Sequence, residues 1–249
     1  MSFVKRCLLT ILICCMCVSS SAYALSLGGE DKKVADTIMN RIIRSNSRID
    51  LVMAPESDRM HPDLVERYVD EKCGKYYRVT TCLYTREWHN DRWFEGFVIH
   101  TRDAKNMYNY NTMLEKKAKK IVKKYTRKRM SKKNKARALA KGVAKMLSYR
   151  DYDDNDVEAS MARNLKRNKG VCCTYAQLYQ ACCDIAKIEC VHVIGYADGG
   201  LHSWNRVKIG EKWKFVDTTW YDATKRSKYI MSSKLWGSHK MVRSIIVFE

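Results

Sequence analysis

The sequence contains little proline and little glycine, with two prolines and 11 glycines among 249 residues. No linker rich in these residues, internal repeat or low-complexity segment occurs, so repeat architectures are excluded. Hydrophobic residues make up 46% and aromatic residues 10%, a composition typical of a folded globular protein. The length allows one sizeable core or two small lobes.

Metal-binding motifs are also lacking beyond residue 24. Zinc sites usually show Cys-x-x-Cys spacing, and the cysteines that follow residue 24 do not have it. No calcium-loop pattern occurs, so neither a metal nor a cofactor is predicted. The residues weighed as zinc ligands are Cys172, Cys173, Cys182, Cys183, Cys190 and His192.

The first 24 residues have the pattern of a signal peptide. A short basic start, MSFVKR, precedes an apolar run, and SSSAYA ends in the small-x-small pattern of a cleavage site after Ala24. The uncharged run from Cys7 to Ala24 has 18 residues, so an uncleaved membrane anchor is the alternative. The prediction is a secreted, periplasmic or cell-envelope protein.

Export would place seven cysteines in an oxidising compartment. An odd number suggests one free thiol and up to three disulfides, with Cys73–Cys82 as a plausible local bridge. In a reducing compartment all seven would be buried thiols.

Acidic residues are scarce in one segment of a chain whose formal charge is +20, or +18 without Lys5 and Arg6. From Glu115 to Lys145 there are 15 lysines or arginines against one acid. Residues 114–145 could therefore face an anionic envelope polymer or a membrane surface, or could form an ordinary solvated helix face. Export argues against nucleic acid as a partner.

Residues 25–103 read as a small α/β portion of unknown role. Val34, Ile38, Ile42 and Ile43 predict one helical stripe, and HPDLVERYVDEKCGK predicts a second helix with Pro62 near its start. YYRVTTCLYT and RWFEGFVIHT predict two paired strands with WHND as the turn.

Residues 104–249 are predicted to form one α+β domain. Leu114, Ala118, Ile121, Val122 and Tyr125 follow one helical stripe, and Ser131 is placed to cap the next helix. Residues 171–187 form a further helix, and three runs that favour strands follow it.

Cys172 lies in the first turn of that further helix, just after Gly170. The positive end of a helix dipole favours a thiolate there, and amide N–H groups could bind an oxyanion. A cysteine alone is a weak signal, because most cysteines are core residues or form disulfides.

His202 and Asp217 strengthen the signal. If HSWNRVKI and KWKFVDTTW form a hairpin with a two-residue turn at Gly210–Glu211, His202 pairs with Thr219. His202 and Asp217 then lie diagonally on one face, with Cβ atoms about 5.5–7 Å apart. Cysteine, histidine and aspartate in these roles make a nucleophilic triad.

These motifs resemble the core of the transglutaminase-like superfamily, in a secreted, bacterial type. Members carry glycine-x-cysteine-x-x-aromatic-alanine at a helix start, then histidine-x-tryptophan-asparagine and tryptophan-x-x-valine-aspartate strands. GVCCTYA, HSWN and WKFVD match these patterns, over about residues 110–240, a region that includes the KYIMSS segment and His239. Further matching positions are Tyr175, Ala176, Trp204, Asn205, Trp213 and Trp220.

The resemblance implies a cysteine-proteinase-like α+β core with the nucleophile at a helix N-terminus packed on an antiparallel sheet. It implies Cys172 as nucleophile, with His202 and Asp217 completing the triad, and an upstream oxyanion-supporting side chain for which Tyr149 or Tyr152 could serve. The chain departs from the family where Thr218 replaces the frequent proline, and where Cys173 leaves open a nucleophile shifted by one residue or a vicinal redox role.

The implied activity is that of a thiol enzyme acting on protein or peptide substrates. A Cys172 thioester resolved by water gives proteolysis or deamidation, and one resolved by an amine gives cross-linking. Hydrolysis is favoured, because water needs no second binding site. The alternative is a catalytically silent binding or scaffold module, although such modules commonly lose the cysteine or histidine that this chain keeps.

Overall fold

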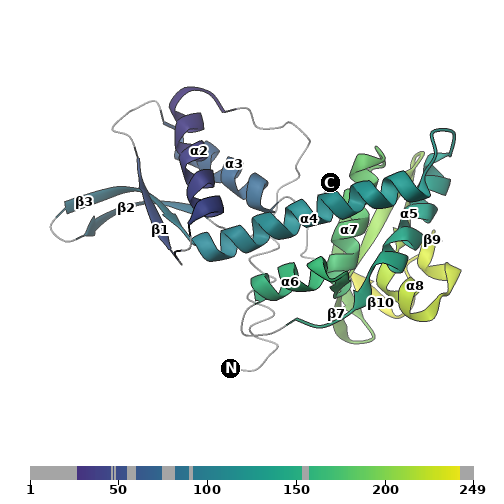
Figure 1. Ribbon diagram of the computed structural model, residues 1–249. Coiled ribbons are helices and arrows are strands. Elements are labelled where there is room, and N and C mark those ends of the chain that lie inside the picture. The colour runs from purple at the N-terminus through teal and green to yellow at the C-terminus, as the bar shows by residue number, and fades with distance from the viewer. Residues whose placement is uncertain are drawn as a thin grey trace. The chain divides into compact units, whose positions relative to one another are not determined.

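The computed structural model describes residues 27–45, 47, 49–54, 60–74, 82–89, 92–152 and 157–241 (Figure 1). The predicted signal peptide, residues 1–24, lies outside these residues. Within them, no helix has both the length and the apolar character needed to cross a membrane. The chain divides into two compact units, with the boundary after Asn111. The domain boundary predicted after residue 103 stays a prediction.

The first unit contains a three-stranded antiparallel sheet in the order β1–β3–β2. Helix α2 packs against helix α3, and α3 also contacts β2. The bounds of these elements are α2 Gly29–Arg44, β1 Asp50–Met53, α3 Pro62–Gly74, β2 Cys82–His89 and β3 Arg92–Ile99.

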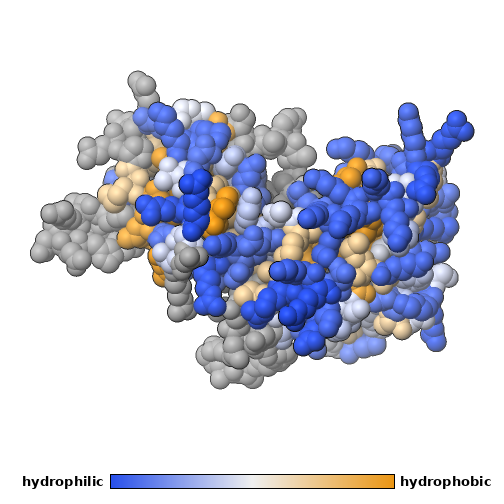
Figure 2. Space-filling view, viewed as in Figure 1, coloured by the Kyte–Doolittle hydropathy of each residue, from blue (hydrophilic) through white to orange (hydrophobic). Residues whose placement is uncertain are grey.

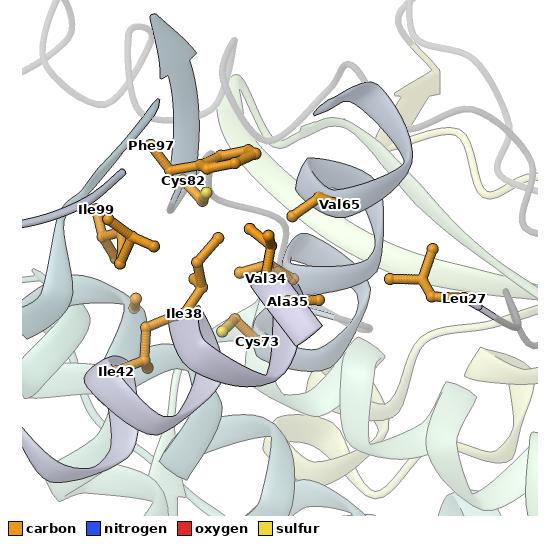
Figure 3. Packing of buried hydrophobic residues seen from close by; sticks show 13 residues of the cluster. Leu27, Val34, Ala35, Ile38, Ile42, Val65, Cys73, Cys82, Phe97 and Ile99 are labelled. Atoms are coloured by element: carbon orange, nitrogen blue, oxygen red, sulfur yellow. The ribbon is translucent and has the colours of Figure 1, made fainter. Parts of the chain in front are cut away.

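The core of this unit forms where the apolar stripe of α2 meets α3 and the sheet (Figure 3). Val34, Ile38 and Ile42 are buried as the spacing predicts. Ile43 is 42% exposed, so its assignment to the stripe was wrong. It follows Ile42 by 100° around the helix and therefore leaves the buried face.

The β2–β3 hairpin confirms the predicted strand pair, but WHND is not its turn. The ladder continues through Trp88 paired with Trp93 and His89 paired with Arg92. Two of the four predicted turn residues therefore belong to β2, because both strands carry residues that favour extended backbone up to these positions.

The predicted Cys73–Cys82 disulfide is absent. Cys73 and Cys82 are both buried in the first unit, and no disulfide joins any of the seven cysteines within the described residues. Burial, followed by the charges of Asp70 and Glu66, raises the pKa of the Cys82 thiol, so Cys82 stays protonated and unreactive.

Two lysine-rich helices lead into the second unit. They are α4, Thr101–Tyr125, which begins in the first unit, and α5, Lys132–Met146. The Ser131 side chain caps α5 by accepting from the Asn134 N–H, as predicted. A Cβ at Gly142 would lie 2.7 Å from the Ile121 side chain, so only glycine allows α5 to approach α4 this closely.

The second unit is built on a five-stranded antiparallel sheet in the order β10–β6–β7–β8–β9. Smaller elements are α6 Val157–Lys166, the β4–β5 bridge of Ser148–Tyr149 with Lys169–Gly170, α8 Thr218–Thr224 and the 3₁₀-helix η1 Ser227–Tyr229. The strands are β6 Cys190–Ala197, β7 Gly200–Ile209, β8 Lys212–Val216, β9 Ile230–Ser232 and β10 His239–Met241.

Helix α7, Cys172–Ile185, packs on β6 and β7, while α5 covers α7 and α8. The helix buries Tyr175, Tyr179 and Cys182. The predicted α+β fold, with a helix that begins at Cys172 packed on an antiparallel sheet, is confirmed.

Candidate active site

Cys172 is the first residue of α7, at the end of a short parallel bridge that pairs Gly170 with Tyr149. A Cβ at Gly170 would lie 2.5 Å from the Thr174 Cβ, so glycine is required for a close approach. Val171 is the N-cap and provides no capping side chain, and the first turn contains no acidic residue. The N-terminal dipole therefore acts on the Cys172 thiol without a competing carboxylate.

His202 and Asp217 form a buried pair. His202 Nε2 donates to Asp217 Oδ2 over 2.8 Å, and the side chains are 8% and 0% exposed. The hairpin register is the predicted one, with Ile209 opposite Lys212. The predicted pairing of His202 with Thr219 is wrong, since the β7–β8 ladder ends at Val216.

Asp217 leaves the sheet because it caps the next helix. Its Oδ1 accepts from the Trp220 N–H over 2.9 Å, which makes Asp217 the N-cap of α8. Its Oδ2 is then available to His202. The aspartate thus meets the histidine from a helix start rather than from a paired strand.

Electrostatics favour an ion pair in this site. Burial alone would lower the pKa of His202, but hydrogen bonds with Asp217 and Cys172 outweigh burial and raise the pKa to about 9. Burial opposes ionisation of Asp217, yet hydrogen bonds from His202 and His239 hold its pKa below the usual value. Because Nε2 of His202 is occupied by Asp217, Nδ1 is the nitrogen available to the Cys172 thiol.

The two tyrosines considered for oxyanion support lie in different surroundings. The Tyr152 hydroxyl contacts Cys173 Sγ at 3.2 Å and Thr174 Oγ1 at 2.8 Å. Tyr149 is 55% exposed, and its pKa is raised to about 12 by burial of part of the side chain and by the negative charge of a Cys172 thiolate. Of the two, Tyr149 is the one whose ionisation responds to Cys172.

Cys173 differs from its neighbour. Burial raises the pKa of the Cys173 thiol and outweighs its hydrogen bond with Tyr152. A protonated thiol is a poor nucleophile, which favours Cys172 over the assignment shifted by one residue.

Sequence reasoning assigned no role to His239, which completes the site from β10. His239 Nε2 lies 3.0 Å from the same Asp217 Oδ2 that His202 contacts. A histidine on a short strand near aromatic residues gives no signal in the sequence that separates it from a core histidine. His202, Asp217 and His239 bring potential metal ligands together, but donation by both Nε2–H groups already satisfies Oδ2, and we assign no metal to them.

His192 is a further buried histidine, which lies on β6 opposite Asn205 of β7. Its Nε2 is buried and has no hydrogen-bond partner within the described protein. Burial, followed by the positive charge of His202, lowers the pKa of His192 to about 4. His192 is therefore neutral in the folded protein at neutral pH.

This burial predicts a loss of stability in mild acid. Below pH 6.5 the unfolded chain protonates His192, while the folded chain resists protonation down to about pH 4, so unfolding becomes easier as the pH falls through this window. His192→Asn removes the penalty, which reaches about 3 kcal/mol. Urea denaturation at pH 7 and pH 5 should show a smaller pH difference for the variant than for the wild type. An equal difference in both proteins would contradict the assignment, and exposed His61→Asn provides the baseline.

Comparisons with known proteins give a family match and several similar proteins. Residues 119–218 match the family model of the transglutaminase-like superfamily. The chain is 33% identical over 86 residues to the kyphoscoliosis peptidase of Mus musculus, a stretch covering 26% of this chain and 13% of the mouse protein. The chain thus spans only a small part of that relative's length.

Two solved structures are also similar. A transglutaminase structure shares 15% identity with a TM-score of 0.38 and covers 61% of this chain and 50% of its own. A candidate cysteine protease from Cytophaga hutchinsonii shares 23% identity with a TM-score of 0.34, over 44% of this chain and 37% of its own. The family match thus assigns residues 119–218 of this chain to the transglutaminase-like superfamily.

Proposed function

We propose that the protein is an exported thiol enzyme that uses Cys172 as nucleophile on peptide or glutamine acyl groups. The observation that carries the proposal is the buried 2.8 Å contact of His202 with Asp217, next to the thiol at the start of α7. A thiolate, an imidazolium that can protonate the leaving group, and an aspartate that fixes the imidazole are what acyl transfer requires.

The reaction has two steps. The Cys172 thiolate attacks the acyl carbon, His202 gives its proton to the departing ammonia or amine, and a thioester forms on Sγ. Water then yields a carboxylic acid, or an amine yields a new amide; His202 takes a proton from the attacking water or amine, and the Cys172 thiolate leaves. Water as the acceptor requires no second binding site, so hydrolysis or deamidation is the proposed outcome.

Trapping of the thioester tests the proposal. The purified chain is incubated with glutamine-containing peptides, quenched in acid and measured by intact mass. An adduct equal to the peptide minus ammonia or an amine, located on Cys172 and released by hydroxylamine, supports the enzyme. Absence of any adduct, together with tight binding of a peptide, would favour the silent binding module instead.

We also propose that the lysine-rich face of α4 and α5 holds the enzyme at an anionic membrane surface. All 15 cations between residues 115 and 145 lie in the second unit, and within the described residues none of them pairs with a carboxylate. Figure 2 shows hydrophilic side chains over the region of α5. Such cations contribute about 1 kcal/mol each near anionic lipid.

Vesicle binding tests the basic face. We expect sedimentation with phosphatidylglycerol-containing vesicles but not with pure phosphatidylcholine, and release as NaCl rises from about 50 mM to about 500 mM. Lys120→Glu/Lys124→Glu should weaken binding at least tenfold. The exposed pair Lys212→Glu/Lys234→Glu makes the same charge change elsewhere and should have a smaller effect. Equal effects of the two pairs, or salt-independent binding, would contradict the proposal.

A further inference from the structure

Two imidazole rings form hydrogen bonds with the same oxygen, Asp217 Oδ2. His202 Nε2 approaches it to 2.8 Å from β7, and His239 Nε2 approaches it to 3.0 Å from β10. An ionised carboxylate only accepts hydrogen bonds, so both Nε2 atoms carry a proton. With the Trp220 N–H on Oδ1, the carboxylate has three donors.

The tautomer of a neutral His239 is fixed from its other side. Ser238 Oγ lies 2.9 Å from His239 Nδ1. Because Nε2 donates to Asp217, Nδ1 of the neutral ring is an acceptor and Ser238 donates to it. The hydrogen bonds therefore converge on Asp217: Ser238 donates to His239, and His239 and His202 both donate to Asp217 Oδ2.

Aromatic rings enclose His239 and leave it little freedom. Its side chain is fully buried, and its ring centroid lies 4.7 Å from Trp220, 4.8 Å from Trp236, 5.1 Å from Trp204 and 6.5 Å from Tyr229. The cage excludes water, so no solvent donor could replace the imidazole at Oδ2. A buried carboxylate that loses a donor in such surroundings favours its protonated form.

We propose that His239 is a positioning residue of this site, whose Nε2–H keeps Asp217 ionised and directed at His202. The proposal rests on the proposed nucleophilic role of Cys172, and it adds a second histidine to the three residues of the triad. His239 touches neither the thiol nor the acyl group. It acts through Asp217, on the stability of the His202 imidazolium.

The titratable groups around His239 make the expected effect specific. His202 faces it from β7, Asp217 from the junction of β8 and α8, and Tyr229 from η1, while the remaining contacts described for the ring are indoles. Without the His239 donor, Asp217 gains a proton at higher pH and His202 loses its counterion. His202 then loses its proton at lower pH, and the Cys172 thiol loses its cationic partner.

Alkylation of Cys172 by iodoacetamide measures this without any substrate. We expect His239→Phe to slow alkylation at pH 6.5 at least tenfold and to move the acid limb of the pH–rate profile to higher pH. His239→Gln keeps an N–H near the position of Nε2 and should restore most of the rate. Ser238→Ala should give a smaller slowing in the same direction.

The controls separate this proposal from the proposed function. A wild-type rate and pH profile in His239→Phe, or an acid limb moved to lower pH, would overturn the positioning role. If His239→Phe does not fold, as judged by its circular-dichroism signal, the test uses Ser238→Ala and His239→Gln instead. An alkylation rate in Ser238→Ala equal to that of the wild type would then overturn the positioning role of His239. If Cys172 of the wild-type protein is alkylated rapidly but never forms a thioester, the proposed enzyme activity is contradicted and the positioning role of His239 is not.

Discussion

Cys172→Ala is expected to abolish both rapid iodoacetamide labelling and thioester formation while the fold survives. The side chain begins a helix, where alanine is well tolerated, and it is only partly buried, so its removal costs little stability. Labelling with limiting reagent across pH 5–9, mapped by mass spectrometry, should locate the wild-type adduct on Cys172.

Cys173→Ala is the matched control for this experiment. Its thiol is held protonated by burial and hydrogen-bonds to Tyr152, so its removal should leave most of the labelling rate. If Cys173→Ala abolishes labelling and Cys172→Ala does not, the nucleophile moves by one residue. A wild-type protein that labels neither cysteine argues against an activated thiol altogether.

Asp217→Asn should lower the rate of thioester formation by about 10²–10⁴-fold with little loss of structure. Asparagine is also a good N-cap, so the Oδ1 contact with the Trp220 N–H can persist. An amide N–H facing His202 Nε2 would make that nitrogen an acceptor. The proton would then lie on Nδ1, which could no longer accept one from Cys172.

A control variant and the pH dependence of the rate test whether Asp217→Asn acts by changing the tautomer of His202. Asp198→Asn, in the exposed turn between β6 and β7, makes the same charge change outside the site and should leave the rate unchanged. The Asp217→Asn profile should lose the limb that reports formation of the thiolate–imidazolium pair. An unchanged profile would mean that Asp217 does not act on His202.

The second unit was more predictable from its sequence than the site that it supports. The two-residue turn at Gly210–Glu211 predicted the register of β7 and β8, because the length of a hairpin turn determines which residues pair. The N-cap role of Ser131 and the start of α7 at Cys172 followed from local chemistry as well. These are interactions between residues near one another in the chain.

Longer-range interactions were not visible in the sequence. The sequence pattern placed Asp217 on the same face of a strand pair as His202. In the structure Asp217 lies beyond the end of the β7–β8 ladder, and it contacts His202 from its position as the N-cap of α8. His239 reaches Asp217 only because β10 pairs with β6 at the sheet edge. Similarly, Cys73 and Cys82 looked like a bridge by spacing, while their burial as separate thiols depends on the packing of the first core.

The pairing of β10 with β6 determines when the site can become complete during synthesis. Gly195 of β6 has no side chain, and a Cβ there would lie 2.3 Å from the Lys240 carbonyl oxygen, so β10 can pair with β6 only because this residue is glycine. A nascent chain that has left the ribosome as far as Asp217 already contains the thiol and the imidazole, but it lacks His239. By the proposed role of His239, such a chain lacks the donor that directs Asp217 at His202, so the site is completed only when β10 joins β6.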